Sequence, residues 1–170
     1  EHFKPDEVDF YFSDQVDNLP QETANLNTNR NEEEDELEDD LSKDNSTLPS
    51  LLLVEDNKDL CNLIKMQLED QFRIYIANNG VEGLKKVHLY HPDIVVTDQM
   101  MPEMDGTEML QRIRKDFKIS HIPVVILTAK SGDEAKTTAI SLGANAYITK
   151  PFSKDYLVAR IEQACIIKLL

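Results

Sequence analysis

The chain has 170 residues, which suits one domain plus an additional segment, because single domains cluster near about 100–150 residues. Its formal net charge is −14, but residues 1–49 hold 16 acidic and 3 basic side chains, whereas residues 50–170 hold 16 and 15. The second part is therefore electrically balanced, and it has no basic excess of the kind that marks a nucleic-acid-binding face.

The cysteines and the apolar runs indicate the compartment in which the protein is expected to work. The two cysteines lie far apart in the sequence, with no CxxC or Cys/His cluster, which is typical of reduced thiols in a cytosolic protein. No apolar run approaches the roughly 20 residues of a membrane span, and no signal peptide opens the chain. We therefore expect a cytoplasmic protein without a membrane segment of its own.

The first 49 residues differ in composition from the rest. Residues 1–17, which begin EHFKPDEVDFYF, are the more apolar part, and we interpret them as the trailing segment of a preceding domain. Residues 18–49 are rich in Asn, Gln, Glu and Asp and contain the run NEEEDELEDD. Low hydrophobicity and high like charge cannot offset chain entropy, so they predict a disordered acidic linker. Because the first residue is Glu rather than Met, we expect this to be a piece of a longer protein.

From residue 50 onward, short apolar runs alternate with stretches of helical spacing. The predicted strands, in chain order, are Leu51–Val54, Phe72–Ala77, Asp93–Thr97, Val124–Thr128 and Asn145–Ile148. Their nearly continuous Val, Ile and Leu content is typical of strands that are buried on both faces of a parallel sheet.

The stretches between these runs are predicted helices. Leu60, Ile64 and Leu68 recur every four residues, and the last stretch has the same kind of apolar side. Expected N-caps are Asn57 for the first helix, Asp133 for the fourth and Ser153 for the last. Five strand–helix units over residues 50–170 predict a doubly wound α/β domain with helices on both faces of the sheet.

Polar side chains follow these strands at the points where the strands end. The first strand leads into Glu55 and Asp56, the third ends at Asp98, the fourth ends at Thr128, and Lys150 follows the fifth. In open α/β sheets, ligands bind at the carboxyl ends of the strands. If the first, third and fourth strands are neighbours, three carboxylates, a hydroxyl and an ammonium group converge on one pocket.

Such a cluster favours phosphoryl chemistry. Three adjacent carboxylates repel one another unless a cation lies between them, and Mg²⁺ commonly pairs one or two carboxylates with water and phosphate oxygens. Lys150 suits the role of counter-charge for a phosphoryl group, and the Thr128 hydroxyl can donate to one of its oxygens. One aspartate is then placed to attack phosphorus and form an acyl phosphate.

The motifs LLLVEDN, DIVVTDQMMPEMDG, IPVVILTAK and GANAYITKPF resemble the receiver domain of two-component response regulators over residues 50–170. This resemblance implies a flavodoxin-like five-stranded parallel sheet with strand order 2-1-3-4-5. It also implies that Asp98 is the phospho-acceptor and that Thr128 and Lys150 contact the phosphoryl group. Asp56 and Asp98 would bind Mg²⁺ directly and Glu55 would bind it through water.

Further roles follow from the same resemblance. Met100 would give its backbone carbonyl to the metal, Tyr147 would be a rotating switch aromatic, and the bond between Lys150 and Pro151 would be cis. Independently of it, Pro102 and Gly106 are expected to be turn residues that steer the chain into the third helix. The acidic pair departs from the commoner Asp-Asp of the family, and Gly83 stands where a helix former is usual, but neither change removes the chemistry.

We expect the domain to take a phosphoryl group from a kinase phosphohistidine and to catalyse its own aspartyl phosphorylation and dephosphorylation. The signal would then change the surface of the fourth helix, fifth strand and fifth helix, through which a homodimer is possible. Residues 1–10 resemble the stretch that follows the ATP-binding domain in some hybrid sensor kinases, whose parent chain can be anchored in the inner membrane. The alternatives are a stand-alone response regulator and a pseudo-receiver that only binds partners. An aspartate-nucleophile phosphatase is disfavoured, because it requires a second Asp where Met100 stands.

Overall fold

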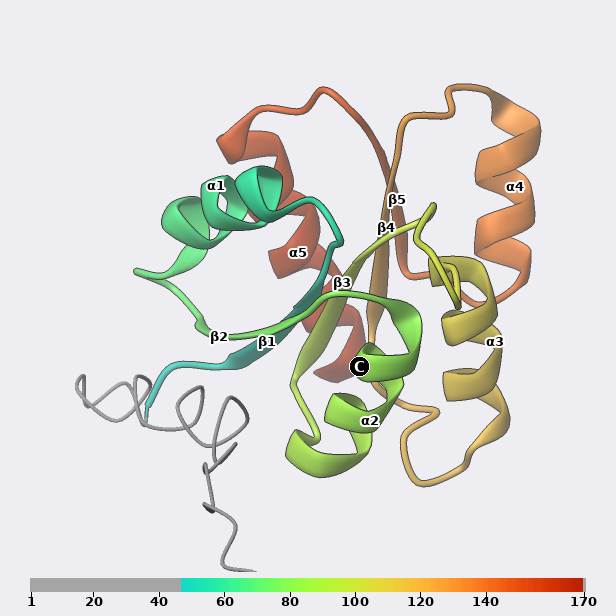
Figure 1. Ribbon diagram of the computed structural model, residues 1–170, viewed down its shortest axis with the longest axis horizontal. Coiled ribbons are helices and arrows are strands. Elements are labelled where there is room, and N and C mark those ends of the chain that lie inside the picture. The colour runs from blue at the N-terminus through green and yellow to red at the C-terminus, as the bar shows by residue number, and fades with distance from the viewer. Residues whose placement is uncertain (1–46, 170) are drawn as a thin grey trace, which may run out of the picture. The chain divides into compact units, whose positions relative to one another are not determined.

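The computed structural model describes residues 47–169, so the predictions for residues 1–17 and for nearly all of residues 18–49 lie outside the described part of the chain. Strands and helices alternate along it, and Figure 1 shows them in chain order. The elements are β1 Ser50–Val54, α1 Lys58–Leu68, β2 Arg73–Ala77, α2 Gly80–Tyr90, β3 Ile94–Asp98, α3 Gly106–Lys115, β4 Val124–Thr128, α4 Asp133–Ser141, β5 Ala146–Thr149 and α5 Lys154–Leu169. Within residues 47–169, none of the helices has the length and apolar character needed to cross a membrane.

The five strands form one parallel sheet in the order β2-β1-β3-β4-β5. This confirms the doubly wound α/β class and the strand order 2-1-3-4-5. β1 and β3 are neighbours at the centre of the sheet, and β4 lies on the other side of β3. The carboxyl ends of these three strands therefore meet at one edge, as the site prediction requires.

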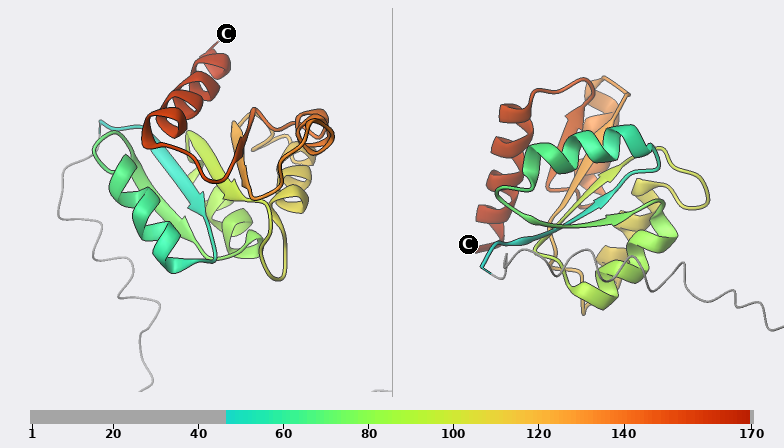
Figure 2. Two further views of the ribbon diagram at one scale, coloured as in Figure 1. Left: turned by 90° about the horizontal axis from the view of Figure 1, so that it is seen from above. Right: turned by 60° about the vertical axis from the view of Figure 1, so that its left-hand side comes forward.

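Alternating side chains of the central strands build two cores, one on each face of the sheet. Leu51 and Leu53 of β1 pack on the face that is covered by α1 and α5, whereas Leu52 and Val54 pack on the face covered by α2, α3 and α4. Figure 2 shows these two helix layers with the sheet between them. Burial on both faces explains why the strands are continuously apolar rather than alternating.

Helix caps confirm two predictions and correct one. Asn57 accepts a hydrogen bond from the Leu60 amide and Ser153 accepts one from the Tyr156 amide, as expected of N-caps. Asp133 is not a cap, because α4 already begins at this residue and Gly132, with φ +142°, occupies the cap position without a side chain to accept a hydrogen bond. Asp133 instead places its charge in the first turn, where it favours the positive end of the helix dipole.

The loop between β3 and α3 is fixed at both ends by glycine amides. The Gly106 amide donates to the Gln99 carbonyl at 2.9 Å, and the Gly80 amide donates to the Met104 carbonyl at 3.1 Å. A Cβ at Gly106 would overlap the backbone oxygen of Asp98, so only glycine fits where α3 begins. The loop that follows Asp98 is therefore closed on itself by one bond and held to the start of α2 by the other.

Candidate functional site

Three carboxylates gather at the carboxyl edge of the sheet, as predicted. Glu55 and Asp56 directly follow β1, and Asp98 is the last residue of the neighbouring strand β3. One oxygen from each of the three side chains lies within 4.8 Å of the others. Glu55 and Asp98 are buried, whereas Asp56 is exposed, so the cluster has one open side.

Lys150 places its ammonium group in the middle of this acidic cluster. Its Nζ lies 3.3 Å from Glu55 Oε2 and 3.3 Å from Asp98 Oδ2. The backbone fixes this position, because the Lys150 amide donates to the Thr128 carbonyl at 2.7 Å across β4 and β5. The bond between Lys150 and Pro151 is cis, which confirms the expectation from sequence.

Burial of Glu55 disfavours the charged form of its carboxyl group. Burial raises the pKa of Glu55, and the Asp98 carboxylate adds to the rise; the hydrogen bond from the Asn57 amide and the charge of Lys150 only partly oppose it. A buried carboxylate beside a second one is therefore poorly neutralised by a single lysine. The three carboxylates can therefore bind a further cation in addition to the Lys150 ammonium group.

Thr128 lies next to the cluster, but its hydroxyl binds Gln99, which the sequence motifs do not predict as a site residue. Thr128 is fully buried and donates to Gln99 Oε1 at 2.6 Å, while its oxygen accepts a hydrogen bond from the Lys130 amide at 3.0 Å. The one sequence signal for Gln99 is its position directly after Asp98. An amide there is unremarkable in sequence, and only the fold brings it to the end of β4.

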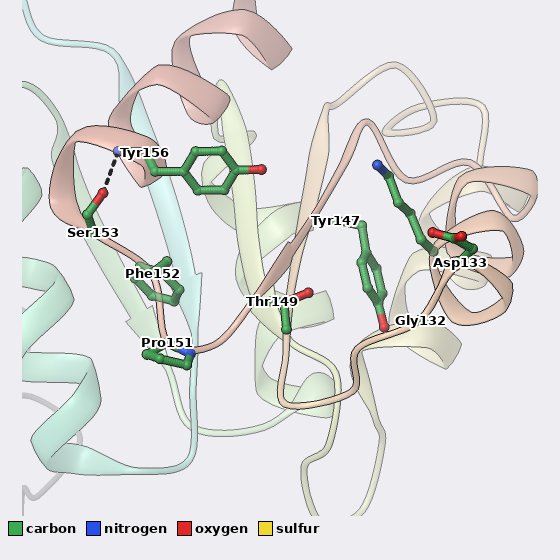
Figure 3. Close-up of a pocket in the computed structure, with 9 residues that line it drawn as sticks. Gly132, Asp133, Tyr147, Thr149, Pro151, Phe152, Ser153 and Tyr156 are labelled. Atoms are coloured by element: carbon green, nitrogen blue, oxygen red, sulfur yellow. Dashed lines mark hydrogen bonds between the residues drawn. The ribbon is translucent and has the colours of Figure 1, made fainter.

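Tyr147 is linked to the same strand end through the Lys130 backbone. Its hydroxyl donates to the Lys130 carbonyl at 3.2 Å, and the ring is buried. Tyr147 is therefore turned toward the end of β4, and its role as a switch stays a prediction. It also lines an open hollow of about 510 Å³ between α4, β5 and α5. Figure 3 shows the Tyr147 ring on the side of Gly132 and Asp133 and the Tyr156 ring of α5 across the hollow.

The remaining predicted residues lie around the loop after Asp98. Met100 is 61% exposed, and the metal role of its backbone carbonyl stays a prediction. Pro102 accepts a hydrogen bond from the Met104 amide at 2.8 Å within the turn. Gly106 is the first residue of α3 rather than part of the turn.

The residues at this edge fit a hard divalent cation. Carboxylate oxygens are the ligands that Mg²⁺ prefers, and one or two of them usually suffice together with water. Here three carboxylates converge, and the raised pKa of Glu55 reflects, after burial, the charge of Asp98 beside it. The exposed Asp56 gives a cation access from solvent.

Comparisons with known proteins agree with this geometry. Residues 51–162 match the family model described as the response regulator receiver domain. The chain is 39% identical over 113 residues to hybrid signal transduction histidine kinase D of Dictyostelium discoideum, covering 66% of this chain and 7% of that protein. It is 38% identical over 113 residues to the transcriptional regulatory protein TrcR of Mycobacterium tuberculosis, covering 66% of this chain and 43% of that protein.

Solved structures give the same result for the fold. The receiver domain of the Francisella response regulator 1452 superposes with a TM-score of 0.66 at 32% identity, covering 70% of this chain and 98% of that domain. The matched region is therefore a whole domain of these relatives, whereas it spans less than half the length of the two signalling proteins above.

Proposed function

The chain belongs to the response regulator receiver domain family, and from that membership we propose that Asp98 accepts a phosphoryl group from a histidine kinase. One observation carries this proposal: Lys150 Nζ lies 3.3 Å from Asp98 Oδ2 and 3.3 Å from Glu55 Oε2 at the carboxyl edge of the sheet. A fixed cation beside a buried aspartate, with further acids around it, is the arrangement that phosphoryl transfer to a carboxylate needs.

In the proposed reaction an oxygen of the Asp98 carboxylate attacks the phosphorus of a phosphohistidine on the kinase. The new O–P bond forms as the N–P bond breaks, and the bonding pair stays on the imidazole nitrogen of the donor. The product is an aspartyl phosphate, which is an acyl phosphate. The Lys150 ammonium holds positive charge beside the phosphoryl oxygens, and the Thr128 hydroxyl is a donor for one of them. Hydrolysis of the same bond by water would end the signal.

Mg²⁺ is the cofactor that this donor set favours. We assign Asp56 and Asp98 as direct ligands together with the backbone carbonyl of Met100, and Glu55 as a ligand through water. When bound, Mg²⁺ supplies positive charge next to the transferring phosphoryl oxygens. The protein's own contribution is to hold three carboxylates within 4.8 Å of one another on a rigid strand edge.

The proposed output is a change in the surface formed by α4, β5 and α5. Thr128 ends β4 and Tyr147 lies on β5, and the Lys130 backbone connects the two side chains. A phosphoryl group that draws the Thr128 hydroxyl toward Asp98 would therefore pull on the segment before α4. The hollow beside Tyr147 lies on that surface, which makes it the place where a partner or a second copy would detect the change.

The parent protein is proposed to be a hybrid sensor kinase. The matched relatives include a protein named as a hybrid histidine kinase, and the acidic residues 18–49 would tether the receiver to its own kinase domain. A cytoplasmic location and a membrane anchor elsewhere in the parent are part of this proposal. A stand-alone response regulator is the second candidate, because a transcriptional regulator is also among the matched relatives. A pseudo-receiver is disfavoured, since Asp98, Thr128, Lys150 and the acidic pair are all present.

Incubation with a small-molecule phosphodonor and Mg²⁺, followed by intact mass measurement, tests the acceptor. The wild-type protein is expected to gain one phosphoryl group, which is lost on treatment with hydroxylamine because an acyl phosphate is sensitive to it. Asp98→Asn is expected to gain none, and EDTA is expected to prevent the gain in the wild-type protein. A wild-type protein that stays unmodified, or an Asp98→Asn variant that is modified equally, contradicts the assignment.

A further inference from the structure

The hydroxyl of Thr128 is already engaged in this structure. A threonine hydroxyl has a single proton to donate, and this one is donated to Gln99 Oε1 at 2.6 Å. The oxygen of the same hydroxyl accepts from the Lys130 amide at 3.0 Å, so the group is fixed from both sides. Thr128 can donate to a phosphoryl oxygen on Asp98 only if its bond to Gln99 is broken.

The acceptor on Gln99 is carried by a rigid backbone. The Gln99 amide donates to the Leu127 carbonyl at 2.8 Å across β3 and β4, and the Gln99 carbonyl accepts from the Gly106 amide at 2.9 Å. Both sides of the Gln99 main chain are therefore held between the sheet and the start of α3. An acceptor placed in this way offers the Thr128 hydroxyl a fixed partner rather than a chance contact.

The bond to Gln99 is one end of a directional chain. The Lys130 amide donates to the Thr128 oxygen, and the Thr128 hydroxyl donates to Gln99. Hydrogen bonds that point the same way along a chain polarise and strengthen one another. The hydrogen bond from the Lys130 amide therefore strengthens the bond from Thr128 to Gln99, without any contribution from Asp98.

We propose that Gln99 is a positioning residue that competes with the phosphoryl group for the Thr128 hydroxyl. It sets how strongly phosphorylation must pull on Thr128 before the α4–β5–α5 surface responds. This inference rests on the proposed function, because it concerns how the same site binds its phosphoryl group. The acidic cluster and Lys150 act on the phosphoryl group itself, whereas Gln99 is an internal acceptor that opposes the movement of the Thr128 hydroxyl toward that group.

Binding of beryllofluoride, a tetrahedral analogue of the phosphoryl group, measures this competition. Gln99→Met keeps the length of the side chain and removes the acceptor, so in Mg²⁺ it is expected to bind beryllofluoride about three- to tenfold more tightly than the wild-type protein, the factor that one net hydrogen bond represents. Titration calorimetry gives the affinities. The NMR resonance of the Lys130 amide, which donates to Thr128, is expected to shift in the free Gln99→Met protein. Gln99→Leu provides the same comparison if the Met variant does not fold.

A double-mutant cycle separates this role from a general effect of the substitution. In a Thr128→Val background the hydroxyl is gone, so adding Gln99→Met is expected to leave the beryllofluoride affinity unchanged. Equal affinities of the wild-type and Gln99→Met proteins, or the same gain in both backgrounds, overturn the proposal while leaving phosphoryl acceptance by Asp98 intact. A wild-type protein that binds no beryllofluoride in Mg²⁺ instead contradicts the proposed function, and the role of Gln99 with it.

Discussion

At the scale of single residues, two glutamates have opposite electrostatic environments. Burial raises the pKa of Glu55 and Asp98 adds to the rise, so the protonated form of this side chain is favoured by folding. Burial also acts to raise the pKa of Glu82, but the hydrogen bond from the Asn78 amide and the pairing with Lys86 outweigh it, and the pKa is lowered. One glutamate therefore destabilises the folded state when it ionises, whereas the other stabilises it.

Replacing Glu55 tests the first of these effects. The folded-state pKa of Glu55 lies above the ordinary value of 4.5. The stabilisation of the folded state by protonated Glu55 is therefore complete below pH 4.5, and it is lost as the pH rises through the folded-state pKa. Glu55→Gln keeps an acceptor for the Asn57 amide and removes the charge. In EDTA at neutral pH we expect the variant to unfold at a higher temperature than the wild-type protein, and at acidic pH we expect the difference to shrink. Thermal denaturation followed by circular dichroism measures both.

Glu82→Gln is the matched control, since the sign is reversed. The folded-state pKa of Glu82 is lowered, so its stabilising contribution is present above pH 4.5 and is lost as the pH falls through the folded-state pKa. This variant is expected to unfold at a lower temperature than the wild-type protein at neutral pH. A Glu55→Gln variant that is less stable than the wild-type protein in EDTA would show that the Lys150 pair outweighs burial.

At the scale of elements, the start of α3 controls where Asp98 lies. Gly106 is the first residue of α3, and its amide binds the Gln99 carbonyl at 2.9 Å. A Cβ at this position would overlap the backbone oxygen of Asp98 and approach Thr97 Oγ1 at 3.1 Å. Both neighbours belong to β3, whose five residues are all buried. The helix is therefore in close contact with the acceptor strand, and glycine makes that contact possible.

Gly106→Ala is expected to lower the free energy of unfolding by about 1–3 kcal/mol, the usual cost of overpacking a rigid site. It is also expected to slow phosphorylation of Asp98, because β3 must shift away from the helix. Urea unfolding and the phosphodonor assay measure the two effects. Thr107→Ala, one residue later on the same helix, is expected to change the free energy of unfolding by no more than about 0.5 kcal/mol. Equal stability of the two variants would mean that α3 adjusts freely.

The sequence is a good guide to elements whose signal is local. The five strands were predictable because continuous Val, Ile and Leu runs have few other interpretations, and the strand limits differ from the prediction mainly at the ends: β2 begins at Arg73 rather than Phe72, and β5 ends at Thr149. Asp133 shows the limit of such patterns. An acid before a helical stretch fits either a cap or a first-turn position, and in the structure Gly132 takes the cap position and Asp133 the first turn.

At the scale of the whole molecule, the site residues were predictable because parallel strands bring their carboxyl ends to one edge. Glu55 and Asp98 follow from the strand order, because β1 and β3 are neighbours, whereas Lys150 reaches them from the end of β5, beyond β4. Gln99 does not, because its role depends on which way its side chain points from a strand end. Hydrogen bonds of this kind, between a side chain and a group distant in the sequence, leave no local pattern in the sequence.

Arg114 is a second example, on the edge of the sheet opposite the acceptor. From the end of α3 its guanidinium donates to four acceptors in the segments that flank β4 and β5: the carbonyls of Gly143, Ser120 and Ile122, and Asn145 Oδ1, at 2.7–3.1 Å. Burial lowers the pKa of Arg114, and carbonyl and amide dipoles surround its charge. The side chain thereby joins α3 to the chain entering β4 and β5.

Arg114→Met is expected to lower the free energy of unfolding by about 2–4 kcal/mol, because it leaves several partly buried acceptors without their donor. Arg112→Met, two residues earlier on α3, removes only an exposed pair with Glu108 and is expected to cost at most about 1 kcal/mol. Urea unfolding measures both, and phosphorylation of Asp98 in the folded protein is expected to be the same in the two variants, because Arg114 lies at the far edge of the sheet. If Arg114→Met costs no more than Arg112→Met, the four hydrogen bonds contribute little to stability, and the segments around β4 and β5 are held by the hydrophobic cores instead.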